Sequence, residues 1–277
     1  MKNLGQKIEY LNWLNSVGIG YYCSEQKDSK KDLISELKSL NRPIKEMPAL
    51  DKKENKKTVV MPKKTPQLTS HPAELEARKL ADNAKDLKEL REAVENFTGC
   101  DLKQFASNTV FADGIASAKI LLVGEAPGAT EDAQGIPFCG ESGKLLDSML
   151  STIGISRAKN AYITNTIFWR PPANRTPTNE EINICKPFVE KHIALIKPKL
   201  IILVGGTATT FLLGKNEGIS YIRKHNYPYI NQYLEEPITT TAIFHPAYLL
   251  RQPMQKKTTW FDLLKIQELL KSLNLEL

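Results

Sequence analysis

Three polar loops carry the residue types that could do chemistry in this chain. The first, residues 119–140, runs from an apolar stretch into a Gly/Pro turn with Glu125, then an acidic pair and a second turn that presents Phe138. The second loop follows Asn165, and the third begins at His245. A polar loop at the carboxyl end of a strand is where an open α/β sheet places its ligand site. Each loop is therefore a candidate part of such a site.

Each loop taken alone also has a purely structural interpretation. The first could be a strand-to-helix turn with a solvated acidic pair. Asn165 could cap a strand end, and His245, which precedes a proline, could be a turn histidine. Leu249 and Leu250 could be the start of a core helix. A single motif is only a hypothesis until its structural context is known.

The elements that must position these loops alternate along the chain. Apolar runs predict strands at residues 119–123, 161–165, 200–204 and 240–244. Helical spacing predicts helices at residues 70–96, 142–153, 179–196, 207–213 and 260–273. Strands that alternate with helices imply a parallel sheet with helices on both faces. We therefore expect a three-layer α/β/α fold with a central four-stranded, mainly parallel sheet.

The 277 residues allow either one large domain or one domain with an appendage. We expect a short helical segment over residues 1–40, a basic Pro/Lys-rich and disordered linker over residues 41–70, and the main domain over residues 71–277. The net charge is +7, and residues 1–70 carry 14 Lys+Arg against 8 Asp+Glu. This basic extension could hold a polyanion or be a solvated linker, and composition leaves both open.

Composition excludes several classes of protein. No apolar run approaches the 18 residues of a transmembrane helix. The first residues lack the apolar segment of a signal peptide, so we expect a cytoplasmic protein with no membrane partner. The four cysteines are scattered and form no CxxC pair, which argues against a disulfide framework or a simple zinc site.

The motifs in combination resemble those of the family 4 uracil-DNA glycosylases of bacteria and archaea. The resemblance covers roughly residues 97–270. It rests on GEAPGxxED at 124–132, GxPFxG at 135–140, GxLLDxML at 143–150, YITN at 162–165, RPPxNRxP at 170–177, CKPF at 185–188 and HPAYLLR at 245–251. It implies a DNA base excision repair enzyme that hydrolyses the N-glycosidic bond of uracil and leaves an abasic site.

The iron–sulfur ligands of that family are incomplete in this chain. Most members hold a 4Fe–4S cluster with four cysteines, and the corresponding positions here are Phe97, Cys100, Trp169 and Cys185. Aromatic side chains cannot bind iron, and such a cluster normally requires four thiolates. We therefore expect no metal and no cofactor. The two aromatic side chains should fill the volume, with the two cysteines as small buried remnants.

The resemblance also assigns roles to the loop residues. The uracil is flipped out of the DNA, stacks on Phe138 and is read by the amide of Asn165. His245 donates a hydrogen bond to the leaving base, and Glu125 either positions a water or acts as its base. The predicted uracil site is completed by Ala126 and Glu131. Glu131 would lie beside uracil C5 and help to exclude thymine.

DNA contacts are expected outside the uracil site. Leu249 and Leu250 are interpreted as an apolar wedge that holds the duplex open, braced by Tyr248 and Arg251. The basic residues expected near phosphates are Arg170, Arg175, Arg251, Lys256 and Lys257. For the lysines, solubility is an equally simple explanation. The expected partner is uracil-containing DNA, single- or double-stranded, bound by a monomer.

Two other classes of function compete with this interpretation. The first is a protein that binds uracil or abasic DNA without turnover, which the missing cluster ligands make worth considering. The second is a nucleotide-binding α/β enzyme with residues 124–128 around a phosphate. This loop has neither GxGxxG nor GK[ST], and Pro127 removes one of the amide donors that a phosphate site uses.

Overall fold

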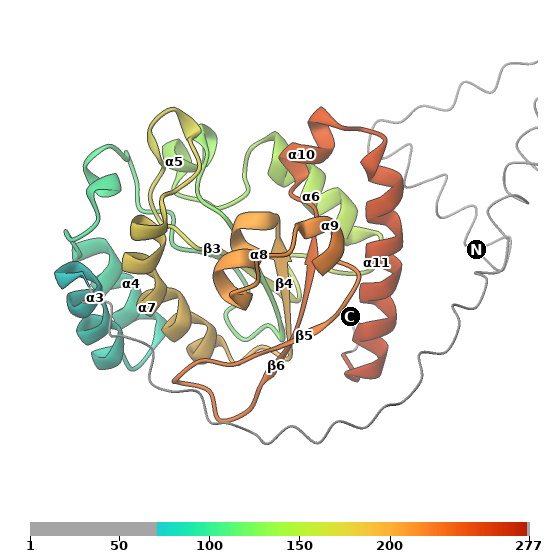
Figure 1. Ribbon diagram of the computed structural model, residues 1–277. Helices are drawn as coiled ribbons and strands as arrows, with labels where there is room; N and C mark the ends of the chain where they lie inside the picture. Colours follow the sequence, from blue (N-terminus) through green and yellow to red (C-terminus); the bar gives the residue numbers. More distant parts are fainter. Residues whose placement is uncertain (1–70, 276–277) are drawn as a thin grey trace, which may run out of the picture. The chain divides into compact units, whose positions relative to one another are not determined.

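The structure is a computed structural model that describes residues 71–275 (Figure 1). The predicted N-terminal helical segment and basic linker, residues 1–40 and 41–70, lie outside the described residues. The described part of the main domain contains a six-stranded sheet with strand order β1-β3-β2-β4-β6-β5. The strands are β1 Asp113–Gly114, β2 Ile120–Gly124, β3 Ala161–Asn165, β4 Leu200–Val204, β5 Tyr227–Tyr229 and β6 Ile238–Ile243.

The four predicted strands are confirmed as the centre of this sheet. β3, β2, β4 and β6 run parallel to one another in that order. The expectation of only four strands is wrong, because β1 and β5 pair antiparallel at the two edges. These edge strands have two and three residues. They are too short to give a recognisable alternation of apolar and polar residues.

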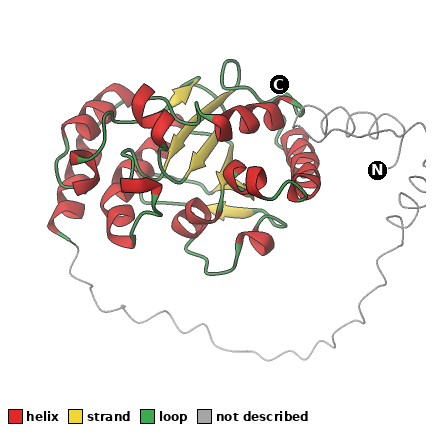
Figure 2. Ribbon diagram, turned by 90° about the horizontal axis from the view of Figure 1, so that it is seen from above, coloured by secondary structure: helices red, strands yellow, loops and turns green. Residues whose placement is uncertain are grey.

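Side chains of the central strands alternate between two apolar cores, one on each face of the sheet. Leu121 and Val123 of β2 lie in the first core, whereas Ile120 and Leu122 lie in the second. The first core is covered by α3 Pro72–Asn83, α4 Leu87–Asn96 and α7 Asn179–Ile196, and the second by α6 Glu141–Ser151, α10 Pro246–Arg251 and α11 Gln255–Ser272 (Figures 1 and 2). The predicted three-layer α/β/α architecture is confirmed.

The helix predicted over residues 70–96 is two helices, α3 and α4. The second begins after Asp86, whose side chain accepts a hydrogen bond from the backbone N–H of Glu89 at 2.8 Å. An aspartate that can cap a helix is the signal that separates the two. The other described α-helices are α5 Ala129–Gln134, α8 Gly206–Leu213 and α9 Ile219–Ile222, and two short 3-10 helices are η1 Asp101–Gln104 and η2 Pro172–Asn174. No helix within residues 71–275 is long and apolar enough to cross a membrane.

The register of the parallel strands brings the three polar loops to the same edge of the sheet. Gly124, the last residue of β2, pairs with Asn165, the last residue of β3. On the other side of β2, Val204 at the end of β4 pairs with Ile243 at the end of β6. His245 follows β6 by two residues. All three loops therefore leave the sheet at its carboxyl edge, where such folds bind ligands.

Candidate functional site

Gly124, Phe138, Asn165 and His245 form a compact group at this edge, here called the central cluster. A Cβ atom on Gly124 would lie 2.4 Å from Asn165 Oδ1 and 2.5 Å from the ring of Phe138. The rings of Phe138 and His245 have centroids 5.8 Å apart and are tilted by 34°. The structure thus brings together three of the residues that the sequence predicted, and glycine is the residue that leaves room for their approach.

Asn165 presents an unused acceptor to this cluster. The residue is 1% exposed, and its Oδ1 has no hydrogen-bond partner among the described residues. A buried polar atom left unpaired costs about 1–3 kcal/mol. A carboxamide both accepts and donates hydrogen bonds. The side chain is therefore arranged to pair with the polar edge of a flat ligand.

His245 is held as a neutral imidazole with a defined tautomer. The residue is the N-cap of α10, and its Nδ1 accepts a hydrogen bond from the backbone N–H of Ala247 at 3.1 Å. Burial, followed by the positive charge of Arg251, lowers the pKa of His245 to about 4, against a smaller opposing effect of Glu131. With Nδ1 as the acceptor, the proton of the neutral ring is on Nε2. His245 can therefore donate a hydrogen bond from Nε2 without carrying charge.

Glu125 lies directly after β2 on a loop that is fixed to the chain after β3. Its backbone carbonyl accepts hydrogen bonds from Thr166 Oγ1 at 2.6 Å and from the backbone N–H of Ile167 at 3.1 Å. Within residues 71–275, its half-buried carboxylate has no hydrogen bond or ion pair. The neighbouring Ala126 is half-buried and packs against the first core. The Glu125 carboxylate is thus available to a water molecule.

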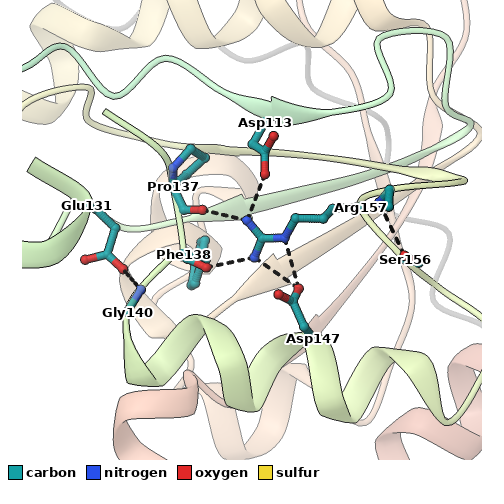
Figure 3. Close-up of polar contacts among 9 residues, drawn as sticks. Asp113, Glu131, Pro137, Phe138, Gly140, Asp147, Ser156 and Arg157 are labelled. Atoms are coloured by element: carbon teal, nitrogen blue, oxygen red, sulfur yellow. Dashed lines mark hydrogen bonds and ion pairs between the residues drawn. The ribbon is translucent and has the colours of Figure 1, made fainter. Parts of the chain in front are cut away.

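The acidic pair is structural rather than solvated. Both oxygens of Glu131 accept hydrogen bonds. Oε1 accepts from the backbone N–H of Gly140 at 2.8 Å (Figure 3). Oε2 accepts from the backbone N–H of Gly128 at 3.2 Å. Asp132 is buried, and its Oδ1 accepts from the backbone N–H groups of residues 107 and 108 at 2.8 and 3.2 Å. The Glu131 carboxylate therefore joins the residues on either side of α5, and the Asp132 carboxylate ties α5 to residues 107 and 108.

One half of the predicted wedge is wrong. Leu249 is fully buried in the second core, whereas Leu250 is 44% exposed. The two leucines lie in α10, where successive side chains point about 100° apart, and the direction of Leu249 places it in the second core. The structural interpretation of Leu249 as part of a core helix holds instead. Met254, which the sequence interpretation overlooked, is 82% exposed a few residues further on.

Lys256 is also wrongly predicted as a surface cation. It is 6% exposed in the first turn of α11, and burial lowers its pKa. By contrast, Arg251 and Lys257 are exposed. Tyr248 is half-buried and packs on Phe244, with ring centroids 5.1 Å apart.

The two arginines of the loop after β3 have protein partners. Arg170 Nε donates to Asn174 Oδ1 at 2.7 Å. Arg175 forms a two-bond ion pair with Glu181, at 2.5 and 2.9 Å, on the exposed side of the loop. Their predicted phosphate contacts stay a prediction, and these bonds fix the loop that carries them.

The positions of the missing iron ligands form part of the first core. Phe97 and Trp169 stack with centroids 6.5 Å apart, and the Trp169 indole N–H donates to Thr109 Oγ1 at 2.9 Å. Cys100 and Cys185 are buried, free thiols. A hydrogen bond with Cys100, and then burial, raise the pKa of the Cys185 thiol. Two thiols and two aromatic side chains do not fit a four-thiolate cluster.

Comparison with known proteins agrees with this geometry. Residues 111–267 match the family model of the uracil DNA glycosylase superfamily. A Type-4 uracil-DNA glycosylase of Sulfurisphaera tokodaii is 39% identical over 186 residues, which cover 66% of this chain and 84% of the relative. Proteins of the same name from Pyrobaculum aerophilum and Archaeoglobus fulgidus are 36% and 38% identical, each over 61% of this chain and 86% of the relative. The chain belongs to the uracil DNA glycosylase superfamily.

The protonation state of His245 gives a prediction that needs no substrate. Nitrogen NMR of the imidazole should show the Nε2–H tautomer at pH 7 and a midpoint near pH 4. Because this folded-state pKa lies below the ordinary 6.5, His245 stabilises the fold fully above pH 6.5. That contribution is lost as pH falls from 6.5 to about 4.

The ring of the exposed His225 provides an internal reference signal in the same spectra. An Nδ1–H tautomer at pH 7, or a His245 midpoint at or above 6.5, would contradict the arrangement described for this residue.

Proposed function

We propose that the protein is a DNA repair glycosylase that flips uracil out of DNA and hydrolyses its N-glycosidic bond, leaving an abasic site. The proposal is supported by the family and by the names of the relatives. The single observation that carries it is the buried Asn165 amide, whose Oδ1 is unpaired beside the ring of Phe138. A flat base with a ring N–H next to a carbonyl would satisfy both features.

Recognition of uracil follows from the chemistry of that amide. Asn165 Oδ1 accepts from the ring N–H of uracil while its amide group donates to an adjacent carbonyl. Cytosine presents an acceptor and an amino group at the same positions. It would therefore leave buried polar groups unpaired, which is a strong basis for discrimination. Phe138 supplies the flat apolar surface on which the flipped base stacks.

His245 acts on the departing uracil, and Glu125 acts on the water that attacks the sugar. As the glycosidic bond lengthens, negative charge develops on the departing uracil. The Nε2–H of His245 donates a hydrogen bond to a uracil oxygen as this charge grows. Glu125 holds the water that attacks the electron-deficient sugar, either as its base or as its positioning group.

Discrimination against thymine is assigned to the turn that Glu131 holds. Its carboxylate fixes Gly128 and Gly140 on either side of Phe138. Because two backbone hydrogen bonds to Glu131 hold this turn, it can shift little to make room for the C5 methyl group of thymine. Ala126, the small residue after Glu125, completes the proposed site.

DNA contacts are assigned to the surface beside α10. Leu250 is the apolar side chain proposed to enter the duplex, with Tyr248 beside it. The cations proposed to lie near phosphates are Arg170, Arg175, Arg251 and Lys257. We further propose that the protein acts as a cytoplasmic monomer on single- or double-stranded DNA.

We also propose that the protein works without an iron–sulfur cluster. The support is the packing of Phe97 against Trp169 and the presence of only two thiols at the four ligand positions. Within residues 71–275, no group of three or more His, Cys, Asp or Glu side chains is arranged to hold a metal ion. Stacked aromatic side chains supply apolar packing at positions where a cluster would be held by metal–thiolate bonds.

The enzymatic proposal is tested with oligonucleotides that carry one uracil. Alkali should cleave them after incubation with the wild-type protein. His245→Ala and Asn165→Ala should each slow uracil release by at least about 100-fold, because each removes a hydrogen bond that the transition state uses. His225→Ala is the matched control and should retain wild-type activity.

The competing possibility is a protein that binds uracil or abasic DNA without turnover. Tight binding of the same oligonucleotides, with no alkali-labile site formed by the wild-type protein, would establish it and refute the glycosylase.

Substitutions of two neighbouring leucines test the assignment of Leu250 as the wedge. Leu250→Ala should slow excision from double-stranded DNA by about tenfold and leave single-stranded DNA unaffected, because only the duplex must be held open. Leu249→Ala should instead lower the free energy of unfolding by about 2–5 kcal/mol, since it empties a buried site. Equal slowing on both DNA forms by Leu250→Ala would contradict the assignment.

Iron analysis and the visible spectrum of anaerobically purified protein test the cluster proposal. A colourless, active enzyme with less than about one iron per chain is expected, because a 4Fe–4S cluster requires four thiolates. A four-cysteine family member purified in parallel controls for loss during handling. A brown protein with about four irons per chain would overturn the proposal.

A further inference from the structure

The stacking residue Phe138 has an unusual backbone conformation. Its φ angle is +51°, in the left-handed region that residues other than glycine rarely adopt. The residue is nevertheless 6% exposed and lies against Gly124 and His245. A conformation of this kind persists only where surrounding contacts enforce it. The groups that hold the Phe138 backbone therefore determine where its ring lies.

Arg157 binds two successive carbonyl groups of this turn. Its Nη1 donates to the Pro137 carbonyl at 2.8 Å, and its Nη2 donates to the Phe138 carbonyl at 2.8 Å (Figure 3). Arg157 lies in the loop between α6 and β3, about 20 residues along the chain. It belongs to none of the sequence motifs that define the site.

The remaining guanidinium donors are fixed by two carboxylates. Asp147 of α6 accepts from Nε at 3.1 Å and from Nη2 at 3.0 Å, and Asp113 of β1 accepts from Nη1 at 3.0 Å. All five N–H groups of Arg157 thus have a partner, which is the full donor capacity of the side chain. The Arg157 side chain is 17% exposed. Its planar fork therefore has a single orientation toward the turn.

The turn is confined on its other side as well. The backbone N–H of Gly140 donates to Glu131 at 2.8 Å. A Cβ atom on Gly143 would lie 1.8 Å from the Phe138 carbonyl oxygen, so the first turn of α6 packs directly against that group. Arg157 is the one described side chain whose donors bind the carbonyls of both Pro137 and Phe138.

We propose that Arg157 is a positioning residue for base excision, which fixes the ring of Phe138 as the stacking surface for the flipped uracil through the carbonyls of residues 137 and 138. This role rests on the proposed glycosylase function. Asp113 and Asp147 hold the guanidinium of Arg157 in place, so they affect the base only through Arg157. A lysine at this position keeps the charge but cannot bind two carbonyls and two carboxylates at once.

The test is a double-mutant cycle between Arg157→Lys and Phe138→Ala, measured as the single-turnover rate of uracil release from single-stranded DNA. Arg157→Lys alone should slow release by about ten- to a hundredfold, the effect of a small misplacement of a positioned group. In the Phe138→Ala background it should cause no further loss beyond about twofold, because the ring on which it acts is gone.

A second readout separates positioning from general loss of structure. Arg157→Lys should weaken inhibition by free uracil, since the stacking surface is displaced, while KM for the oligonucleotide stays within about twofold of wild type. Arg78→Lys is the matched control. Arg78 forms a comparable ion pair with Glu190, at 2.7 Å, on the outer helix α3. This variant should bind uracil and release it at the wild-type rate.

Asp147→Asn keeps the test decisive if Arg157→Lys does not fold. Asp147 is half exposed, and its replacement leaves Arg157 in place with one weakened anchor. It should slow release less than Arg157→Lys and, like it, have no effect in the Phe138→Ala background. If Arg157→Lys or Asp147→Asn slowed uracil release by the same factor in the Phe138→Ala background as in the wild type, the positioning role would be overturned.

The two levels of the proposal fail in different ways. A wild-type protein that releases no uracil would remove the glycosylase function and this role with it. An active wild type whose Arg157→Lys variant is as fast, within about twofold, would overturn only the role of Arg157.

Discussion

This site depends on one steric constraint. The ring of Phe138 and the amide of Asn165 approach each other across Gly124, which has no side chain. Gly124 ends β2 beside Asn165, the last residue of β3. Any Cβ at that position would lie within 2.5 Å of both Asn165 Oδ1 and the Phe138 ring. The parallel register aligns the ends of the two strands. The missing side chain at Gly124 leaves room for a base-sized ligand to contact the stacking ring and the hydrogen-bonding amide together.

Hydrogen bonds to the backbone then fix each group around this point before any ligand arrives. Ala247 sets the tautomer of His245, Thr166 fixes the turn that carries Glu125, and Arg157 fixes the turn that carries Phe138. Polar groups that are already oriented do not have to reorganise as charge develops, which is the main source of their catalytic effect. Asn165 is the exception, because its Oδ1 has no hydrogen-bond donor among the described residues and can accept a hydrogen bond from a ligand.

Sequence patterns predicted the sheet and the loops well, because apolar strands and polar strand ends are local features. They failed where three-dimensional packing decides. Nothing local distinguishes Leu249 from Leu250, and only the orientation of α10 against the second core buries the former. Arg157 could not be found either, because its partners come from residues 113, 137–138 and 147 and meet only in the folded chain. Lys256 likewise has the sequence context of a surface cation, and its burial in the first turn of α11 is visible only in the folded chain.

The central claim is that the Asn165 amide reads the edge of a uracil stacked on Phe138. A crystal structure of the protein with free uracil, the product of the proposed reaction, tests it most directly. The account predicts the uracil ring against Phe138, with its ring N–H about 3 Å from Asn165 Oδ1 and a neighbouring oxygen near Nε2 of His245. Uracil bound elsewhere, or bound on Phe138 with Asn165 turned away from it, would contradict the account.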